Sequence, residues 1–170
     1  IAGAVGNNGI GIAGAAWNMK LMHLKVFQST GAGSANNIAV AVEYAYLNGA
    51  DIINMSWGSF AESITLKTAL ETAYSSSFLV AAAGNNGIPI QGCPNPNCRP
   101  FYPAAYSFVL GIWDTPSSLG GYSNYDPDGP YKTDWTGNLL NYELKAPGIG
   151  IMSTVPNGGY ATLTGTSMAT

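Results

Sequence analysis

Residues 51–87 read DIINMSWGSFAESITLKTALETAYSSSFLVAAAGNNG, and this stretch decides the fold class. Two short apolar runs, at residues 52–56 and 78–83, have the length and composition of buried strands. Residues 63–74, which lie between them, are expected to form a helix. A strand, a helix and a second strand in this order form a right-handed crossover between parallel strands. We therefore predict an α/β fold with a mostly parallel sheet flanked by helices.

The same alternation precedes this stretch, and shorter strands follow it. We predict a strand at residues 21–27 and an amphipathic helix at residues 35–47. In open α/β sheets, sites gather at the carboxyl ends of the strands. Gly31, Ser56 and Asn85 are expected at such ends. The later strands are predicted at residues 108–113, 143–146, 151–155 and 160–163.

The composition agrees with one globular domain and excludes other classes. The 170 residues are enough to bury a core of their own. Only 9% of the residues are charged, against about a quarter in ordinary domains, so the surface must be built largely from uncharged polar residues. The six Lys and Arg residues are not clustered, and the net charge is −3, so nucleic acid is not an expected partner. No apolar run approaches the roughly 18 residues of a membrane span.

The last six residues, GTSMAT at positions 165–170, surround one serine with small residues just before a helix start. Such a turn exposes the serine hydroxyl and leaves the first N–H groups of the helix without internal partners. Free N–H groups of this kind can bind an oxyanion. We therefore predict that Ser167 is a nucleophile and that its own N–H is an oxyanion donor.

Asn85 is the second candidate catalytic residue. It follows an apolar run, in the sequence AAAGNNG at residues 81–87. Its side-chain amide can donate a hydrogen bond to charge that develops on a carbonyl oxygen. Read alone, it is more simply a turn residue that tolerates left-handed geometry. The serine turn downstream favours the catalytic interpretation.

Three strings, NMS at residues 54–56, AAAGN at 81–85 and GTSMA at 165–169, occur in the order found in the subtilisin-like serine peptidases, and the chain resembles that family over nearly its whole length. The resemblance implies endopeptidase activity through an acyl-enzyme, an extended polypeptide as substrate, and no required cofactor. It also implies a substrate-binding surface, made of two pocket walls and of exposed backbone that pairs with an extended substrate. Its members would be Gly31, Gly33, Ser56, Trp57, Gly58, Ala82, Ala83 and Gly84.

The resemblance also implies that the chain is a partial domain, truncated at both ends. In the family, the catalytic aspartate and histidine precede the position of Ile1, and a longer helix follows the nucleophile. Residues 1–6 resemble the end of a helix that began upstream. His23 is the only histidine, and its place within a predicted strand favours a structural role. Because a serine without a neighbouring base is a weak nucleophile, we expect the isolated chain to be inactive.

The alternative is a non-catalytic relative that acts as a binding or structural module. Such a module would need neither Ser167 nor Asn85, so their presence favours the enzyme. The upstream segment would discriminate the two, since an enzyme keeps the family's histidine and aspartate. In either case we expect a secreted or cell-surface protein. Unpaired sheet edges and apolar patches also lead us to expect that the isolated chain associates with itself.

Several further segments were considered for metals and other ligands. Residues 9–14 fit a dinucleotide fingerprint, but the fingerprint requires a preceding strand and a following helix, which the sequence does not predict. In subtilisins a similar loop binds calcium, so Asn8, Ile10 and Ile12 are weak calcium candidates. Residues 126–140 look like an insertion that starts with an Asx turn. Cys93 and Cys98 are a disulfide candidate under the oxidising conditions that an exported peptidase meets, and zinc would need more ligands.

Overall fold

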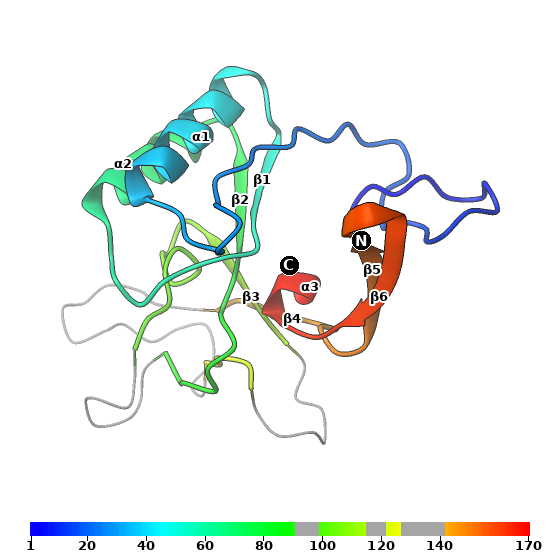
Figure 1. Ribbon diagram of the computed structural model, residues 1–170. Coiled ribbons are helices and arrows are strands. Elements are labelled where there is room, and N and C mark those ends of the chain that lie inside the picture. The colour runs from blue at the N-terminus through cyan, green and yellow to red at the C-terminus, as the bar shows by residue number, and fades with distance from the viewer. Residues whose placement is uncertain (91–98, 115–121, 127–141) are drawn as a thin grey trace.

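The computed structural model describes residues 1–90, 99–114, 122–126 and 142–170 (Figure 1). Its centre is a four-stranded parallel sheet in the order β1-β2-β3-β4, which confirms the predicted fold class. The two longer helices lie side by side along one face of this sheet (Figure 1). The strands of the sheet are β1 (Ile52–Met55), β2 (Phe78–Ala82), β3 (Leu110–Asp114) and β4 (Leu144–Ala146).

A serine N-cap precedes the first residue of each of the two longer helices. Helix α1 (Ala35–Leu47) has the predicted bounds, and the Ser34 side chain accepts a hydrogen bond from the N–H of Asn37. Helix α2 (Ile64–Ala73) is one residue shorter at each end than predicted, because Ser63 is its N-cap and Tyr74 its C-cap. Serine at an N-cap satisfies an N–H that has no partner within the helix. Both helices turn a buried stripe toward the sheet, made of Ile38, Ala39, Val42, Ala45, Leu66, Leu70 and Ala73.

The core lies between these helices and the sheet. Met55, Leu70 and Leu79 are almost fully buried there, as are the small residues Ala81 and Ala82 of β2. At about 25 cal/mol per Å² of buried apolar surface, such side chains supply most of the stabilisation of the fold.

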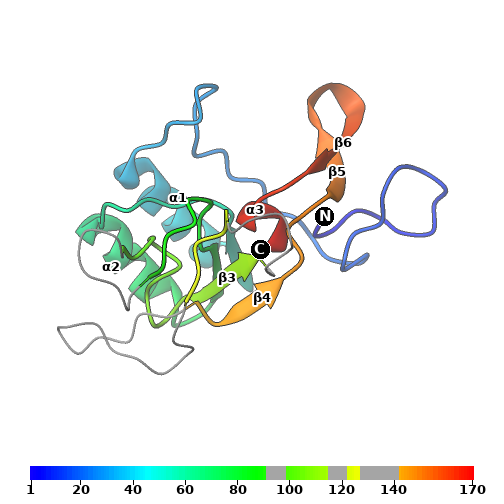
Figure 2. The same ribbon diagram turned by 90° about the horizontal axis from the view of Figure 1, so that it is seen from below.

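The remaining strands form an antiparallel hairpin that stands apart from the sheet, as Figures 1 and 2 both show. It consists of β5 (Ile151–Val155), the 3-10 turn η1 (Pro156–Gly158) and β6 (Gly159–Leu163). The N-terminal segment packs against it, because a side chain on Gly11 would collide with the ring of Tyr160. Helix α3 (Thr166–Ala169) follows β6 directly.

Two sequence-based predictions are wrong. Residues 21–27 form no strand, and Leu21, Met22 and Leu24 are 37–50% exposed. An apolar run becomes a strand only when a neighbouring strand pairs with it, and nothing in the described chain does so here. Residues 1–6 are not helical either, because the carbonyls of Ile1, Ala2 and Ala4 accept hydrogen bonds from residues 14–16 instead.

Two segments lie outside the described residues. Cys93 and Cys98 fall in residues 91–98, and most of the predicted insertion falls in residues 127–141. The disulfide and the Asx turn therefore stay predictions.

Glu143, which precedes β4, has an unusual environment for a carboxylate. Its Oε2 accepts a hydrogen bond from the N–H of Gly111 at 2.6 Å. Burial raises its pKa from 4.5 to about 7, the Gly111 N–H opposes that shift, and the negative charge of Asp126 adds to it. Because the folded-state pKa lies above the unfolded one, the folded protein holds the extra proton between these two values. Its stability therefore falls as pH rises from about 4.5 to about 7.

We expect Glu143→Gln to flatten this dependence, since glutamine keeps the acceptor for Gly111 and cannot ionise. At pH 8 the variant should be more stable than the original chain by about 1 kcal/mol, a value reduced for the partial exposure of the side chain. At pH 4 the two should be equal. Urea denaturation at both pH values measures this, with the exposed Glu43→Gln as the control. An equal difference at both pH values would contradict the assignment.

Candidate functional site

The exits of the parallel strands meet at one edge of the sheet. The register pairs Met55 with Ala81, Ala82 with Ile112, and Asp114 with Ala146, so all four strands end side by side. Helix α3 contacts β2 and β3 at this edge, although it is far from them in sequence (Figure 1). The chain segments after β1 and β2 therefore lie beside the serine turn.

Asn85 and the serine turn are joined through Thr166. The amide oxygen Oδ1 of Asn85 accepts two hydrogen bonds, from the Thr166 N–H at 2.8 Å and from Thr166 Oγ1 at 3.0 Å. Thr166 is buried, and its Oγ1 also accepts the N–H of Gly84 at 3.1 Å. The Asn85 amide nitrogen Nδ2 lies beside Gly165, where an added Cβ would be 3.2 Å away. Within the described residues this Nδ2 donates no hydrogen bond, so its donors are available to a ligand.

Ser167 and Ser56 bind each other across the same edge. Ser167 Oγ donates to the carbonyl of Ser56 at 2.9 Å, and Ser56 Oγ donates to the carbonyl of Ser167 at 3.2 Å. Ser167 is half-buried and Asn85 is exposed. No histidine or carboxylate of the described chain bonds to the Ser167 hydroxyl. A hydroxyl in this arrangement is held in place but is not activated by a base.

A second set of hydrogen bonds connects the serine turn to the end of β3. The buried Asp114 accepts the N–H of Gly148 at 2.7 Å and the hydroxyl of Tyr122. The carbonyl of Gly148 in turn accepts the N–H of Gly165 at 2.9 Å. A side chain on Gly148 would come within 2.7 Å of the Gly165 carbonyl, so only glycine permits this approach.

The two segments predicted as pocket walls, 56–58 and 82–84, lie beside the serine turn, and Phe101 lies against both. An added Cβ on Gly58 would be 2.4 Å from the Phe101 ring, and one on Gly84 would be 3.0 Å from it. Ala82 and Ala83, which precede Gly84, are buried. The Phe101 ring therefore occupies space between the segment 56–58 and the segment 82–84.

Other predicted substrate-binding residues lie elsewhere. Gly31 and Gly33 belong to the turn after residues 21–27, where Gly31 is exposed with φ +80° and Gly33 abuts the ring of Phe27. No hydrogen bond in the described chain joins either glycine to α3. The Trp57 ring packs edge-to-face on Phe27, with 6.1 Å between ring centroids.

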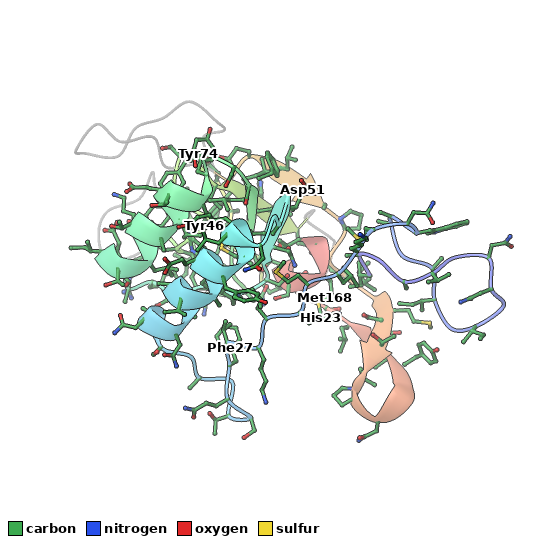
Figure 3. All side chains as sticks on the ribbon, turned by 90° about the horizontal axis from the view of Figure 1, so that it is seen from above. His23, Phe27, Tyr46, Asp51, Tyr74 and Met168 are labelled. Carbon is green, nitrogen blue, oxygen red and sulfur yellow. The ribbon has the colours of Figure 1, made fainter. Side chains whose placement is uncertain are left out.

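His23 does not approach Ser167. His23 and Met168 are labelled next to each other in the view from above (Figure 3), but Figure 1 separates the segment that carries His23 from α3. His23 is also exposed. This placement agrees with the expectation that His23 is not the base.

The loop of the calcium candidates does not by itself fit a calcium ion. Asn8 Oδ1 accepts the N–H of Ile10 at 3.1 Å, and Ile10 is 70% exposed. Calcium takes six to eight oxygen ligands, usually with carboxylates among them. Asn8, Ile10 and Ile12 together supply three neutral oxygens, and the described residues contain no cluster of three potential metal ligands from His, Cys, Asp and Glu.

The same loop lacks the structure of a dinucleotide site. No strand leads into Gly9 and no helix starts directly after Gly14. Among the described helices, none combines the length and the apolar character needed to cross a bilayer.

Sequence reasoning missed the residues that hold the two candidate catalytic groups. Thr166 lies in the GTSMAT sequence from which Ser167 was predicted, but nothing in that sequence indicated a separate role for the threonine. Asp114 ends a short strand, and Asn124 lies in the polar run YSNY at residues 122–125. A buried acid or amide of this kind has no local signature, because its partners are distant in sequence.

Comparisons with known proteins agree with this geometry. The sequence profile of the subtilase family, the S8 peptidases, matches residues 1–170. Alkaline elastase YaB of Bacillus sp. (strain YaB) is 37% identical over 167 residues, which cover 96% of this chain and 38% of that protein. Subtilisin DY of Bacillus licheniformis is 36% identical over 174 residues, which cover 99% of this chain and 57% of that protein. The chain therefore spans well under two thirds of the lengths of these relatives.

Solved structures show the same relationship. A structure of the S41 psychrophilic protease superposes with a TM-score of 0.80 at 32% identity, over 99% of this chain and 56% of that one. Sphericase gives a TM-score of 0.77 at 30% identity, over 94% and 53% of the two chains.

Proposed function

Because the chain belongs to the subtilase family, we propose that it forms part of a serine endopeptidase domain that cleaves polypeptides through an acyl-enzyme. Ser167 is the nucleophile, and the Asn85 amide together with the Ser167 N–H binds the oxyanion. The observation that supports this best is the pair of hydrogen bonds from Thr166 to Asn85 Oδ1. They leave the Asn85 Nδ2 donors free beside the serine turn.

The chemistry follows from these groups. Ser167 Oγ attacks the scissile carbonyl carbon, its proton passes to a base, and the carbonyl oxygen becomes negatively charged. Donors that are already in place stabilise this charge without reorganisation. In subtilisin, a relative, loss of the oxyanion asparagine lowers turnover by about 10²–10³-fold. We expect Asn85→Ala to have an effect of this size.

No residue of this chain is assigned as the base or as the carboxylate that orients it. We propose that the complete protein supplies a histidine and an aspartate from other segments, and that it is secreted or displayed at the cell surface. If calcium binds at Asn8, Ile10 and Ile12, further ligands must come from those segments too. A non-catalytic binding module remains the alternative, and it would lack that histidine.

Labelling with a fluorophosphonate probe tests the nucleophile. We expect the complete protein to be labelled at Ser167, and the 170-residue chain not to be labelled, because its hydroxyl has no base. Mass spectrometry of the labelled peptide locates the modification. Ser167→Ala should abolish it, and Ser153→Ala on β5 should leave it unchanged. Labelling of the 170-residue chain at the rate of the complete protein would contradict the proposal.

We further propose that the substrate pocket accepts only small side chains. The resemblance assigns its walls to the segments 56–58 and 82–84, and the Phe101 ring lies against both. Phe101 is held in turn by the edge-to-face contact with Phe60, with 5.0 Å between ring centroids. A large substrate side chain would have to displace this ring from a packed position.

Replacing the ring tests this restriction. We compare peptides that have Phe or Leu before the scissile bond with peptides that have Ala there. In the complete protein, Phe101→Ala should raise the ratio of their kcat/KM values by about 10-fold or more, since room for a single methylene changes kcat/KM by about 10-fold. Tyr74→Ala, which removes an exposed aromatic ring at the C-terminal end of α2, is the control. An unchanged ratio of the two kcat/KM values would show that Phe101 does not limit the pocket.

We also propose that the isolated chain self-associates with a second copy. Strand β1 lies at the end of the sheet, so its outer edge is unpaired in the described chain. Ile52 on that strand is 57% exposed, and Leu21, Met22 and Leu24 are exposed apolar residues as well. Unpaired edges with apolar side chains form sheets with other molecules.

Light scattering measures this association. We expect the mass of the isolated chain to rise with concentration, and Ile52→Lys to reduce the rise because a charge on an edge strand opposes pairing. Ile64→Lys, at an 80% exposed position on α2, is the matched control and should change nothing. A single monomeric species at high concentration would contradict the proposal.

A further inference from the structure

Asn124 is a buried amide whose side-chain hydrogen bonds all go to the segment that carries Asn85. It is fully buried. Its Nδ2 donates to the carbonyl of Ala83 at 2.7 Å, and its own N–H donates to the carbonyl of Gly84 at 2.8 Å. Its Oδ1 accepts the N–H groups of Asn86 and Ile88, both at 3.0 Å. These bonds reach the backbone on both sides of Asn85 and leave Asn85 itself untouched.

The segment around Asn85 needs such support because it has left the sheet. The Ala83 N–H donates to the carbonyl of Ile112, and beyond it the chain leaves β3. Its backbone then bonds to residues 122–125, where the N–H of Gly87 donates to the carbonyl of Tyr122 and the N–H of Ile90 to the carbonyl of Tyr125. Gly84 and Gly87 both have positive φ, at +97° and +64°, so the chain turns twice within four residues. A turn without ladder hydrogen bonds holds its shape only through other contacts.

Beside the backbone hydrogen bonds to Tyr122 and Tyr125, two side chains hold this turn. Thr166 binds the Asn85 side chain, while Asn124 binds the backbone before and after it. An added Cβ on Gly84 would lie 2.5 Å from Asn124 Nδ2, so the two residues are in direct contact. The direction of the Asn85 amide therefore depends on both contacts.

We propose that Asn124 is a positioning residue that holds Asn85 where its amide meets the oxyanion, an inference that rests on the proposed function. Asn124 touches no substrate and acts only through Asn85. Oxyanion donors work when they are in place before charge develops, and a displacement of about 1 Å lowers the rate by about 100-fold. Loss of Asn124 should thus lower kcat and leave KM nearly unchanged, because the oxyanion exists only in the transition state.

A double-mutant cycle in the complete protein tests this. We expect Asn124→Ala to lower kcat by about 10-fold to 100-fold when Asn85 is present. In the Asn85→Ala background the same change should have almost no effect on kcat, since there is no donor left to position. Asn124→Asp keeps the acceptor for Asn86 and Ile88 and loses the donor to Ala83. It should show a smaller loss and the same dependence on Asn85, and it carries the cycle if Asn124→Ala does not fold.

Ser77→Ala is the matched control. Ser77 is also buried, and its hydroxyl donates to the carbonyl of Ala50 at 2.7 Å, but it lies at the opposite end of β2 from Asn85. This variant loses a buried hydrogen bond without touching the site, so it should lower the melting temperature and leave kcat unchanged.

The outcomes separate this inference from the proposed function. If Asn85→Ala lowers kcat and Asn124 variants lower it by the same factor in both backgrounds, Asn124 has a structural role and the inference is overturned alone. The inference is also overturned alone if Asn124 variants change only KM or change nothing. If Asn85→Ala leaves kcat unchanged, or the complete protein has no peptidase activity, the proposed function fails and the inference fails with it.

Discussion

The site depends on the contact between Thr166 and Asn85, two residues 81 positions apart in sequence. Thr166 is buried and directs both its N–H and its hydroxyl to one amide oxygen. Loss of a buried partner of this kind costs about 1–3 kcal/mol, because the remaining polar group stays desolvated. The contact therefore joins the serine turn to the end of β2 and at the same time determines which end of the Asn85 amide faces outward.

Around this contact, the polar groups at the carboxyl edge form a connected set. Asp114 reaches the serine turn through Gly148 and Gly165, and Asn124 reaches the turn after β2. A buried polar network whose members are all satisfied makes a region rigid, whereas a partly satisfied one destabilises it. The apolar core beneath α1 and α2 holds the sheet together. The polar network at its carboxyl edge holds the Asn85 amide and the Ser167 hydroxyl in fixed positions.

The parts of the molecule that local sequence determines were predictable, and the parts that depend on distant contacts were not. Helix α1 follows from a serine cap and an apolar stripe within residues 34–47. The prediction of a strand at residues 21–27 was wrong because an apolar run does not reveal whether a partner strand is present. Asn85 and Ser167 each stand in a short motif, so sequence alone could nominate them. Asn124 could not be nominated, because its partners lie 36 to 41 residues away.

The order of the elements along the chain has a consequence for biosynthesis. Ser167 follows β1, β2, β3 and β4, and its hydroxyl donates to the carbonyl of Ser56, which comes directly after β1 and 111 positions earlier. Ribosomes release a polypeptide from its N-terminus onward. A nascent chain thus releases all four strands of the sheet before the candidate nucleophile, so the groups to which Thr166 and Ser167 bond are already synthesised when the serine turn emerges.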